Sequence, residues 1–376
     1  MTVTVPRTHA LRTRLLPAST WPEVESTWEG VFAESGSRSF FLSAPWVGAW
    51  LETFGPELTA EIVFFDDDDG TVGAAILTTS QRRLAFLPLR RLHLHTAGEP
   101  EADGAAVEHT TLLCRPDRAD AALAALGALV QSREWDEFVL SGVTKTNLEP
   151  LVRAVPDAQP ESDWRPTYVV DLAKLRREGA RYDSVHSQNT RSQLKRSLRL
   201  YRERGELKLV FAATLEEARA QLAELATLHQ QRWKARGTAG AFASERWRAF
   251  HQRLILRAFA RGGVQLVRVS AGESTIGLLY NFVQGGAVAF YQSGFRYEPD
   301  NRLKPGYVTH ALVIQACLDQ GLDSYDFLAG GPAGSRYKQS LATDIYPLAW
   351  TVLRRPTVRI RMASALRRIK RLVWKG

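Results

Sequence analysis

The chain has 376 residues, enough for two ordinary domains that each bury a core of their own. Hydrophobic residues make up 45% of it and charged residues 24%, a balance that excludes an intrinsically disordered protein. No apolar run approaches the roughly 20 residues that span a bilayer, and the N-terminus lacks a secretory signal, so we expect a cytoplasmic protein. Cys114 and Cys317 lie far apart without metal-site spacing and are predicted to be buried thiols.

The net charge of +9 is unevenly distributed along the chain. Residues 354–375 contain nine Lys or Arg and no Asp or Glu, so the remainder carries 40 basic and 40 acidic residues. The high pI therefore describes the tail and does not indicate a DNA-binding fold. Within the tail, 356–376, apolar residues recur at helical spacing among the bases. This pattern is typical of an amphipathic helix at the inner face of an anionic membrane, and a disordered basic end is the alternative.

The first half of the chain has the pattern of a mixed α/β domain. Helices are predicted to begin near Trp21 and Ser43, where proline falls in the first turn. Strands at 61–65 and 71–79 flank four consecutive aspartates. These acids favour a solvated hairpin turn over a metal site, because side chains in a run point in different directions. A helix over 117–132 and a strand over 137–141 follow.

His93 and His95 alternate along another predicted strand and could chelate a metal. No third ligand has suitable spacing, so we favour partly exposed strand histidines and predict no metal. The segment 155–164 is rich in Pro, Asp and Gln, which suits a linker. We therefore predict domains at 1–160 and 161–355, followed by the tail.

The second half has a more specific order of elements. It begins with a strand at 168–171 and a basic helix at 182–205, which is either a solvated helix or a positive wall beside an anionic ligand. A strand at 207–211 precedes a helix opened by a capping box at Thr214, and Ser244 opens the next helix. The remaining predictions are strands at 264–270, 275–284 and 287–295, a helix to Gln320, and strands at 324–328 and 346–353.

A basic turn, Lys304-Pro305-Gly306, opens the crossover helix of this second half. The free N–H groups and the dipole of a helix start favour an anionic group such as a phosphate. A simple helix-start turn without a ligand is the alternative. We interpret the turn as the likeliest anion site of the chain.

Seven segments occur in an order that resembles a known family: FLSAPWVGAW (41–50), HSQNTRSQLKRSLR (186–199), LHQQRWKARG (228–237), YQSGF (291–295), KPG (304–306), YDFLAG (325–330) and RYK (336–338). The chain resembles the CelD/BcsL-type group of GNAT proteins and is similar to the Fem-type aminoacyl transferases of peptidoglycan synthesis. The resemblance implies a mixed α/β (α+β) fold of tandem GNAT-like acyltransferase domains. The first domain would be degenerate and the second would carry the site.

The resemblance also implies where the acyl donor binds. The strands at 291–295 and 324–328 would splay apart and hold the pantetheine arm of acetyl-CoA or another acyl-CoA. The loop 301–307 takes the place of the pyrophosphate loop but lacks its usual multi-glycine pattern, so aminoacyl-tRNA is the alternative donor. The residues expected to bind the donor are Ser293, Gly294, Arg302, Lys304, Pro305, Gly306 and Tyr307.

Three residues are candidates for proton transfer. Asp326 lies in a short apolar strand, where an unpaired carboxylate is costly, so it is either paired or a general base. Tyr291 could protonate the leaving thiolate or pack in the strand, and Lys338 could bind an anion or be an ordinary exposed base. His310 on the crossover helix is expected to have a packing role. The residues expected to bind the acceptor are Arg232, Trp233, Arg336 and Tyr337.

Three functions follow as hypotheses. The first is transfer of an acyl group from acyl-CoA to the amine or hydroxyl of a sugar or sugar-linked acceptor in cell-envelope or exopolysaccharide synthesis. The second is Fem-like aminoacyl transfer from charged tRNA, against which the neutral charge balance outside the tail argues. The third is a non-catalytic assembly or regulatory factor that uses the same scaffold.

Overall fold

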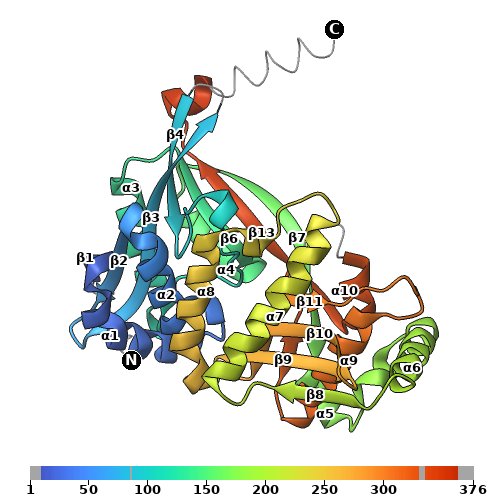
Figure 1. The fold of residues 1–376 in the computed structure, drawn as a ribbon. Coiled ribbons are helices and arrows are strands. Elements are labelled where there is room, and N and C mark those ends of the chain that lie inside the picture. The colour runs from blue at the N-terminus through green and yellow to red at the C-terminus, as the bar shows by residue number, and fades with distance from the viewer. Residues whose placement is uncertain (1–9, 85–86, 330–334, 363–376) are drawn as a thin grey trace, which may run out of the picture. The chain divides into compact units, whose positions relative to one another are not determined.

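The computed structural model describes residues 10–84, 87–329 and 335–362, and it divides the chain into two compact units (Figure 1). Unit 1 contains residues 1–164 and 348–376, and unit 2 contains residues 165–347. β7 (Gln159–Asp171) and β13 (Asp344–Arg354) each run from one unit into the other. The predicted limits at 160 and 355 differ from this division because the second half of β13 pairs with a strand of unit 1.

Unit 1 contains a mixed sheet flanked by helices. The strand order is β1-β2-β3-β4-β6-β13, with β5 beside β3, and only β4 and β6 pair in parallel. Its elements are β1 (Arg12–Pro17), α1 (Trp21–Glu34), α2 (Ala44–Phe54), β2 (Thr59–Asp66), β3 (Thr71–Leu84), β4 (Leu87–Leu94), β5 (Leu113–Cys114), α3 (Ala119–Ser132), β6 (Glu137–Thr144) and α4 (Lys145–Arg153).

Two local predictions for unit 1 have different outcomes. The aspartate run forms the predicted turn, in which Asp67 Oδ1 accepts hydrogen bonds from the N–H groups of Asp69 and Gly70 at 2.9 and 3.1 Å. The predicted partial exposure of His93 and His95 is wrong, since only 6% and 0% of their surfaces are exposed. Both rings lie in the interior of unit 1, and burial lowers the pKa of each to about 4.

Two predictions at other places need correction. The segment predicted as a linker enters β7 at Gln159, so its second half is strand. Cys317 is buried as predicted, but Cys114 is partly exposed because it lies in the short edge strand β5. The amphipathic helix predicted in the tail falls mostly on residues 363–376, which lie outside the described residues.

The strands of unit 2 have the order β7-β12-β11-β10-β9-β8 and continue the same 13-stranded sheet. β11 and β12 pair in parallel and the other neighbours are antiparallel. The elements of unit 2 are α5 (Leu172–Arg177), α6 (Gln188–Arg202), β8 (Leu207–Phe211), α7 (Leu215–Lys234), α8 (Glu245–Ala258), β9 (Val264–Ala271), β10 (Ser274–Gln284), β11 (Ala287–Phe295), α9 (Pro305–Asp319), β12 (Ser324–Asp326) and α10 (Ser335–Leu341). The predicted strands and helices occur in the predicted order, but α5 and α10 are two further helices that the sequence analysis did not predict.

Polar side chains define where the helices of unit 2 begin. Thr214 Oγ1 accepts from the N–H of Glu217, and the Glu217 carboxylate accepts from the N–H of Ala213, which fixes the start of α7. Ser187 caps α6 through the N–H of Thr190. The predicted helix at 182–205 therefore starts later than expected, and a separate 3₁₀ turn precedes it.

α7 and α9 cover opposite faces of the unit 2 sheet. A Cβ on Gly294 would lie 2.5 Å from the Leu225 carbonyl oxygen of α7, and one on Gly277 would lie 2.6 Å from Thr309 Oγ1 of α9. Gly294 pairs with Leu278, the neighbour of Gly277, and successive strand residues face opposite sides. Both glycines therefore allow a helix to approach the sheet closely, one on each face.

Candidate functional site

The two parallel strands of unit 2 separate after three residue pairs. β11 pairs with β12 only through Ala287 to Ala289, and β11 then continues to Phe295 without a β12 partner. Beyond Asp326 the chain stays beside β7, the other neighbour of β12, and the N–H of Phe327 donates to the Tyr168 carbonyl oxygen at 2.8 Å. The predicted splay of these two strands is therefore present.

Asp326 lies where the strands separate and is 8% exposed. Its Oδ1 accepts from Thr167 Oγ1 at 2.8 Å and from the N–H of Leu328 at 2.7 Å, and its Oδ2 accepts from the Tyr346 hydroxyl at 2.9 Å. Paired donors of this kind offset the cost of burying a carboxylate. Asp326 was predicted to be either a paired carboxylate or a general base. These contacts describe a paired carboxylate, and a role of Asp326 as a base stays a prediction.

The chain segment after Asp326 has an unusual backbone that two side chains hold in place. Leu328 has a left-handed φ of 58°, which is uncommon for a branched residue and is typical of functional sites. Asp326 holds its N–H, and the Lys338 ammonium donates to the carbonyl oxygens of Phe327 and Leu328, both at 2.7 Å. Asp326 and Lys338, predicted as catalytic residues, therefore contact the same turn.

One of the N–H groups at the start of α9 already donates a hydrogen bond to α6. Lys304 is the N-cap, and its N–H donates to Ser197 Oγ of α6 at 2.9 Å. Pro305 has no N–H, so Gly306 and Tyr307 supply the first-turn donors that lack a partner within the helix. The Tyr337 hydroxyl donates to the Gly306 carbonyl oxygen at 3.3 Å, and the Tyr307 hydroxyl contacts Ser340 Oγ at 2.8 Å. The space for an anion is therefore limited to two N–H groups and the Lys304 ammonium.

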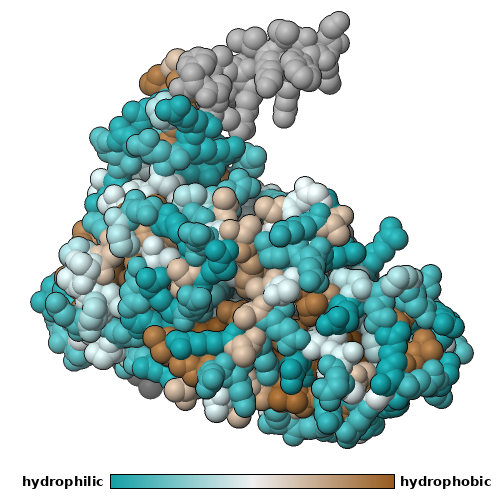
Figure 2. Space-filling model, in the orientation of Figure 1, coloured by the Kyte–Doolittle hydropathy of each residue, from teal (hydrophilic) through white to brown (hydrophobic). Residues whose placement is uncertain are grey.

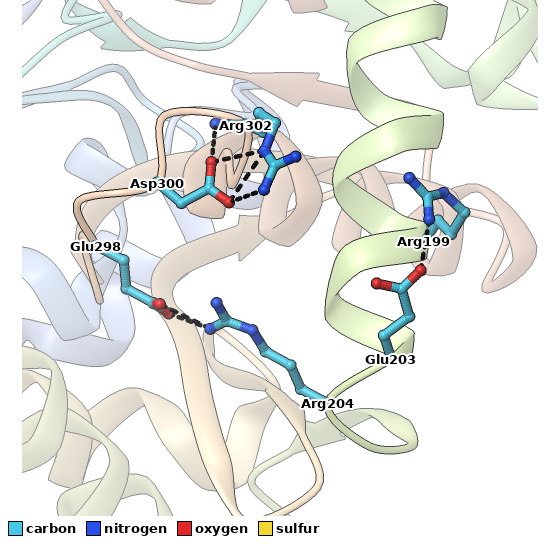
Figure 3. Close-up of polar contacts among 6 residues, drawn as sticks. All are labelled: Arg199, Glu203, Arg204, Glu298, Asp300 and Arg302. Carbon is cyan, nitrogen blue, oxygen red and sulfur yellow. Dashed lines mark hydrogen bonds and ion pairs between the residues drawn. The ribbon is translucent and has the colours of Figure 1, made fainter.

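Ion pairs surround this helix start, and Figure 3 shows three of them. Arg302 contacts the Asp300 carboxylate at 2.8 Å within its own loop. Arg204 contacts Glu298 at 2.6 Å, and Arg199 contacts Glu203 at 2.5 Å along α6. The hydrogen bond from Arg302 lowers the pKa of Asp300 to about 2. Arg302, predicted to bind the donor, thus has a carboxylate partner already.

Other bases of α6 have no carboxylate partner among the residues that the structure describes: Arg191, Lys195, Arg196 and Arg202. Leu194 and Tyr201 form the buried stripe of the helix. The predicted positive wall is therefore a set of four unpaired bases, and α6 also has the buried stripe of the alternative interpretation.

Tyr291 lies on the α7 and α8 face of the sheet. It falls between Phe290 and Gln292, whose partners Asn281 and Tyr280 are adjacent in β10, so Tyr291 is the extra residue of a β-bulge. Its ring stacks on Trp247 with centroids 6.3 Å apart and lies 5.1 Å from the ring of His251. Ser293 and Gly294 follow in the part of β11 that pairs with β10 but has no β12 partner.

The residues predicted to bind the acceptor lie at two places. Arg232 and Trp233 are at the end of α7, where the Arg232 guanidinium lies 4.2 Å from the Tyr297 ring centroid and Trp233 Nε1 donates to His229 at 2.8 Å. Arg336 and Tyr337 are on α10, with Arg336 exposed. The structure therefore brings Tyr337 to the start of α9 and leaves Arg232 and Trp233 on α7.

His310 is packed as predicted, and it lies beside the point where the strands separate. Its ring centroid is 4.6 Å from Phe290 and 5.1 Å from Phe327, the first residues beyond the paired parts of β11 and β12. Nδ1 contacts the Tyr325 hydroxyl at 3.0 Å, and Nε2 is buried without a hydrogen-bond partner in the described part of the chain. Burial lowers the pKa of this imidazole to about 3, so it is neutral.

Sequence reasoning missed Ser197, Tyr325 and His251 as residues of this region. A serine on the apolar side of a basic helix was the available signal for Ser197. No sequence signal indicated the other two, because their partners are distant in the chain. Among the described residues, no group of three or more His, Cys, Asp or Glu is placed to hold a metal. No described helix has both the length and the hydrophobicity needed to cross a membrane.

Comparisons with known proteins agree with this geometry. The family model described as an acetyltransferase (GNAT) domain matches residues 188–339, all within unit 2. A search of curated proteins finds no match. Among solved structures, FemX is 10% identical with a TM-score of 0.56 and covers 86% of this chain and 95% of its own.

Two further solved structures are similar over most of the chain. The C-terminal domain of a putative lysylphosphatidylglycerol synthetase from Agrobacterium fabrum is 9% identical, with a TM-score of 0.53 and coverage of 91% of this chain and 95% of its own. L-PGS from Bacillus licheniformis is also 9% identical, with a TM-score of 0.53 and coverage of 91% and 96%. At these identities the likeness concerns the fold. The mixed α/β, tandem GNAT-like fold is therefore confirmed, and unit 2 contains a GNAT-type domain.

Proposed function

We propose that this protein is an acyltransferase that moves an acyl group from acyl-CoA to an amine or hydroxyl. The observation that carries the proposal is the separation of β11 and β12 next to the start of α9. Strands that separate expose backbone groups that can pair with the amides of a pantetheine arm. The adjacent Gly306 and Tyr307 N–H groups and the Lys304 ammonium can bind a pyrophosphate. The match to the GNAT domain model supports the same assignment.

The acceptor in this proposal is a sugar or sugar-linked intermediate of cell-envelope or exopolysaccharide synthesis. This part depends on the resemblance of seven segments to the CelD/BcsL-type group. A cytoplasmic location follows from the same proposal, with the basic tail as a contact to the inner membrane face. Sedimentation with anionic vesicles tests that contact, because a chain that ends at Arg355 should bind less than the full chain.

Calorimetry with a panel of acyl-CoAs tests the donor. Lys304→Ala should weaken binding about tenfold, the loss expected for one charge-assisted hydrogen bond of roughly 1.5 kcal/mol. Arg302→Ala is the matched control and should weaken it less, because Asp300 already holds that guanidinium. Absence of binding across the panel, or equal losses in both variants, would contradict the proposed donor site.

A second candidate is Fem-like transfer from aminoacyl-tRNA. The four unpaired bases of α6 favour it, because they suit a polyanion. Two groups expected to bind acyl-CoA also have partners within the protein already: Arg302 contacts Asp300, and the Lys304 N–H donates to Ser197. The likeness in fold to FemX supports it as well. The donor would then contact the protein mainly through phosphates along α6.

Filter binding of charged tRNA at several salt concentrations tests this candidate. Replacing Lys195 and Arg196 with alanine should lower the affinity for tRNA. It should also reduce the slope of log affinity against log salt concentration by about one to two, since each phosphate contact releases about one counterion. Arg199→Ala, whose partner is Glu203, is the control. Binding that does not change with salt would remove the candidate.

A further inference from the structure

A cavity of about 530 Å³ lies between α7 and α8 of unit 2. Most of its wall is apolar, and the residues used below are Leu222, Ala223 and Ala226 of α7 and Trp247, His251 and Ile255 of α8. Volumes of about 300–1,000 Å³ with apolar walls and a few polar groups are typical of small-molecule sites. Figure 2 shows hydrophobic residues among hydrophilic ones at the surface over these helices.

The cavity exists because the facing stripe of α7 carries small side chains. Ala223 and Ala226 lie in the same stripe as Leu222, where neighbouring positions of a helix contact its partner. Where the alanines of α7 face α8, the short side chains leave a space between the two helices that no other described side chain fills. A phenylalanine at Ala226 would add six apolar carbons and occupy part of that space.

The cavity wall contains one polar group that lacks a partner. His251 is fully buried, and its Nδ1 contacts the Tyr280 hydroxyl at 3.2 Å. Its Nε2 has no hydrogen-bond partner in the described part of the chain. Burial lowers the pKa of this imidazole well below its usual value, so the ring is neutral. A buried polar nitrogen without a partner is costly, and a ligand oxygen would satisfy it.

Two arginines of the wall differ in their pairing. Arg248 donates to the carbonyl oxygens of Phe242 and Ala243 and lies 3.8 Å from Glu245. Arg219 is exposed and has no carboxylate partner among the residues described. The rim therefore offers one available positive charge, and the interior offers one hydrogen-bonding atom.

The cavity adjoins the residue predicted to protonate the leaving thiolate. Trp247 and His251, which line it, both pack against the Tyr291 ring on β11. Tyr291 lies just beyond the residues of β11 that pair with β12. Trp247 and His251 therefore contact both the cavity and Tyr291.

We propose that this cavity binds an aliphatic chain that carries a carbonyl or hydroxyl oxygen, with that oxygen hydrogen-bonded to His251 Nε2. The chain comes either from the acyl group of the donor or from a separate lipid acceptor. Binding of the aliphatic chain in this cavity does not require the transfer reaction. Only the assignment of that aliphatic chain to the donor rests on the proposed function.

Dodecanoic acid is the probe, with binding measured by calorimetry on the full chain. Ala226→Phe places a ring in the cavity and should weaken binding at least tenfold, whereas Ala220→Phe, on an exposed part of the same helix, should not change it. Ala223→Phe is a second filling variant in case Ala226→Phe fails to fold. His251→Phe keeps a ring but loses the hydrogen bond, and should weaken binding about fivefold. Wild-type protein that fails to bind dodecanoate, or filling variants that bind as wild type, overturns the proposal.

A second set of measurements separates the two sources of the chain. If dodecanoyl-CoA binds at least tenfold more tightly than acetyl-CoA, and Ala226→Phe abolishes only that advantage, the cavity holds the acyl group of the donor. If dodecanoate binds in the cavity while no acyl-CoA binds, the cavity assignment stands and the acyl-CoA donor is wrong. If both acyl-CoAs bind equally and Ala226→Phe leaves dodecanoate binding unchanged, the cavity assignment is wrong and the donor assignment stands.

Discussion

Replacing Asp326 with alanine is expected to loosen the chain segment that leaves β12. The carboxylate accepts from Thr167, Leu328 and Tyr346. The two hydroxyls can rotate toward other partners, but the Leu328 N–H is fixed by its backbone. A buried donor without its acceptor costs about 1–3 kcal/mol, so we expect a loss of about 2–4 kcal/mol in Asp326→Ala. Asp326→Asn should lose about half of this, because its amide oxygen still accepts two hydrogen bonds.

Hydrogen–deuterium exchange of peptides covering residues 322–329 measures this change locally, which matters because two compact units need not unfold together. A local loss of about 2 kcal/mol corresponds to roughly thirtyfold faster exchange. The control is Asp300→Asn, which alters a partly exposed carboxylate in another loop. Unchanged exchange in Asp326→Ala, or the same change in the control, would refute the reasoning.

The same variant separates two roles of Asp326 in catalysis. If Asp326 is the general base, Asp326→Asn should lower kcat by about 10²–10⁴ with donor affinity retained. If it only positions the Leu328 turn, kcat should fall little. Single-turnover measurements with the donor that binds in calorimetry distinguish these results.

Three further predictions concern stability. Burial raises the pKa of Glu99 to about 6 from an ordinary 4.5. The contribution of this carboxyl group to stability is therefore present below pH 4.5 and is lost as the pH rises through 6. Glu99→Gln should remove about 2 kcal/mol of this pH dependence, measured by thermal unfolding at several pH values. Gly294→Ala places a Cβ 2.5 Å from the Leu225 carbonyl oxygen and should cost about 2 kcal/mol or more, measured by thermal unfolding. Ser197→Ala removes the acceptor of the Lys304 N–H and should cost about 1 kcal/mol, with faster amide exchange at the start of α9.

Matched controls exist for these changes. Glu101→Gln alters an exposed carboxylate near Glu99 and should leave the pH dependence as it is. Gly30→Ala in α1 meets no atom within 4 Å and should not destabilise unit 1. Equal effects in a variant and its control would contradict the structural cause given for that prediction.

Local sequence patterns were sufficient for most of the fold. The start of α7 follows from the capping pattern at Thr214, and the hairpin after β2 follows from the aspartates and glycine. These features depend on contacts between residues a few positions apart. The burial of His93 and His95 could not be predicted in this way, because residues 92–95 are all buried, and the segments that cover them, such as the one with Thr111 beside His95, are distant in the chain.

The sequence by itself determined the order of the strands and of helices α6 to α9, the turn at Lys304 that opens α9, and the place of Asp326 in a short strand. Only the tertiary structure decided what these residues contact. The Lys304 N–H meets Ser197, which lies 107 positions earlier, and the Asp326 carboxylate meets Thr167, which lies 159 positions earlier. The bulge in β11 likewise placed Tyr291 against α8, beside the cavity. Hydrogen bonds and ring contacts between distant segments form only when the chain has folded, so no local pattern in the sequence records them.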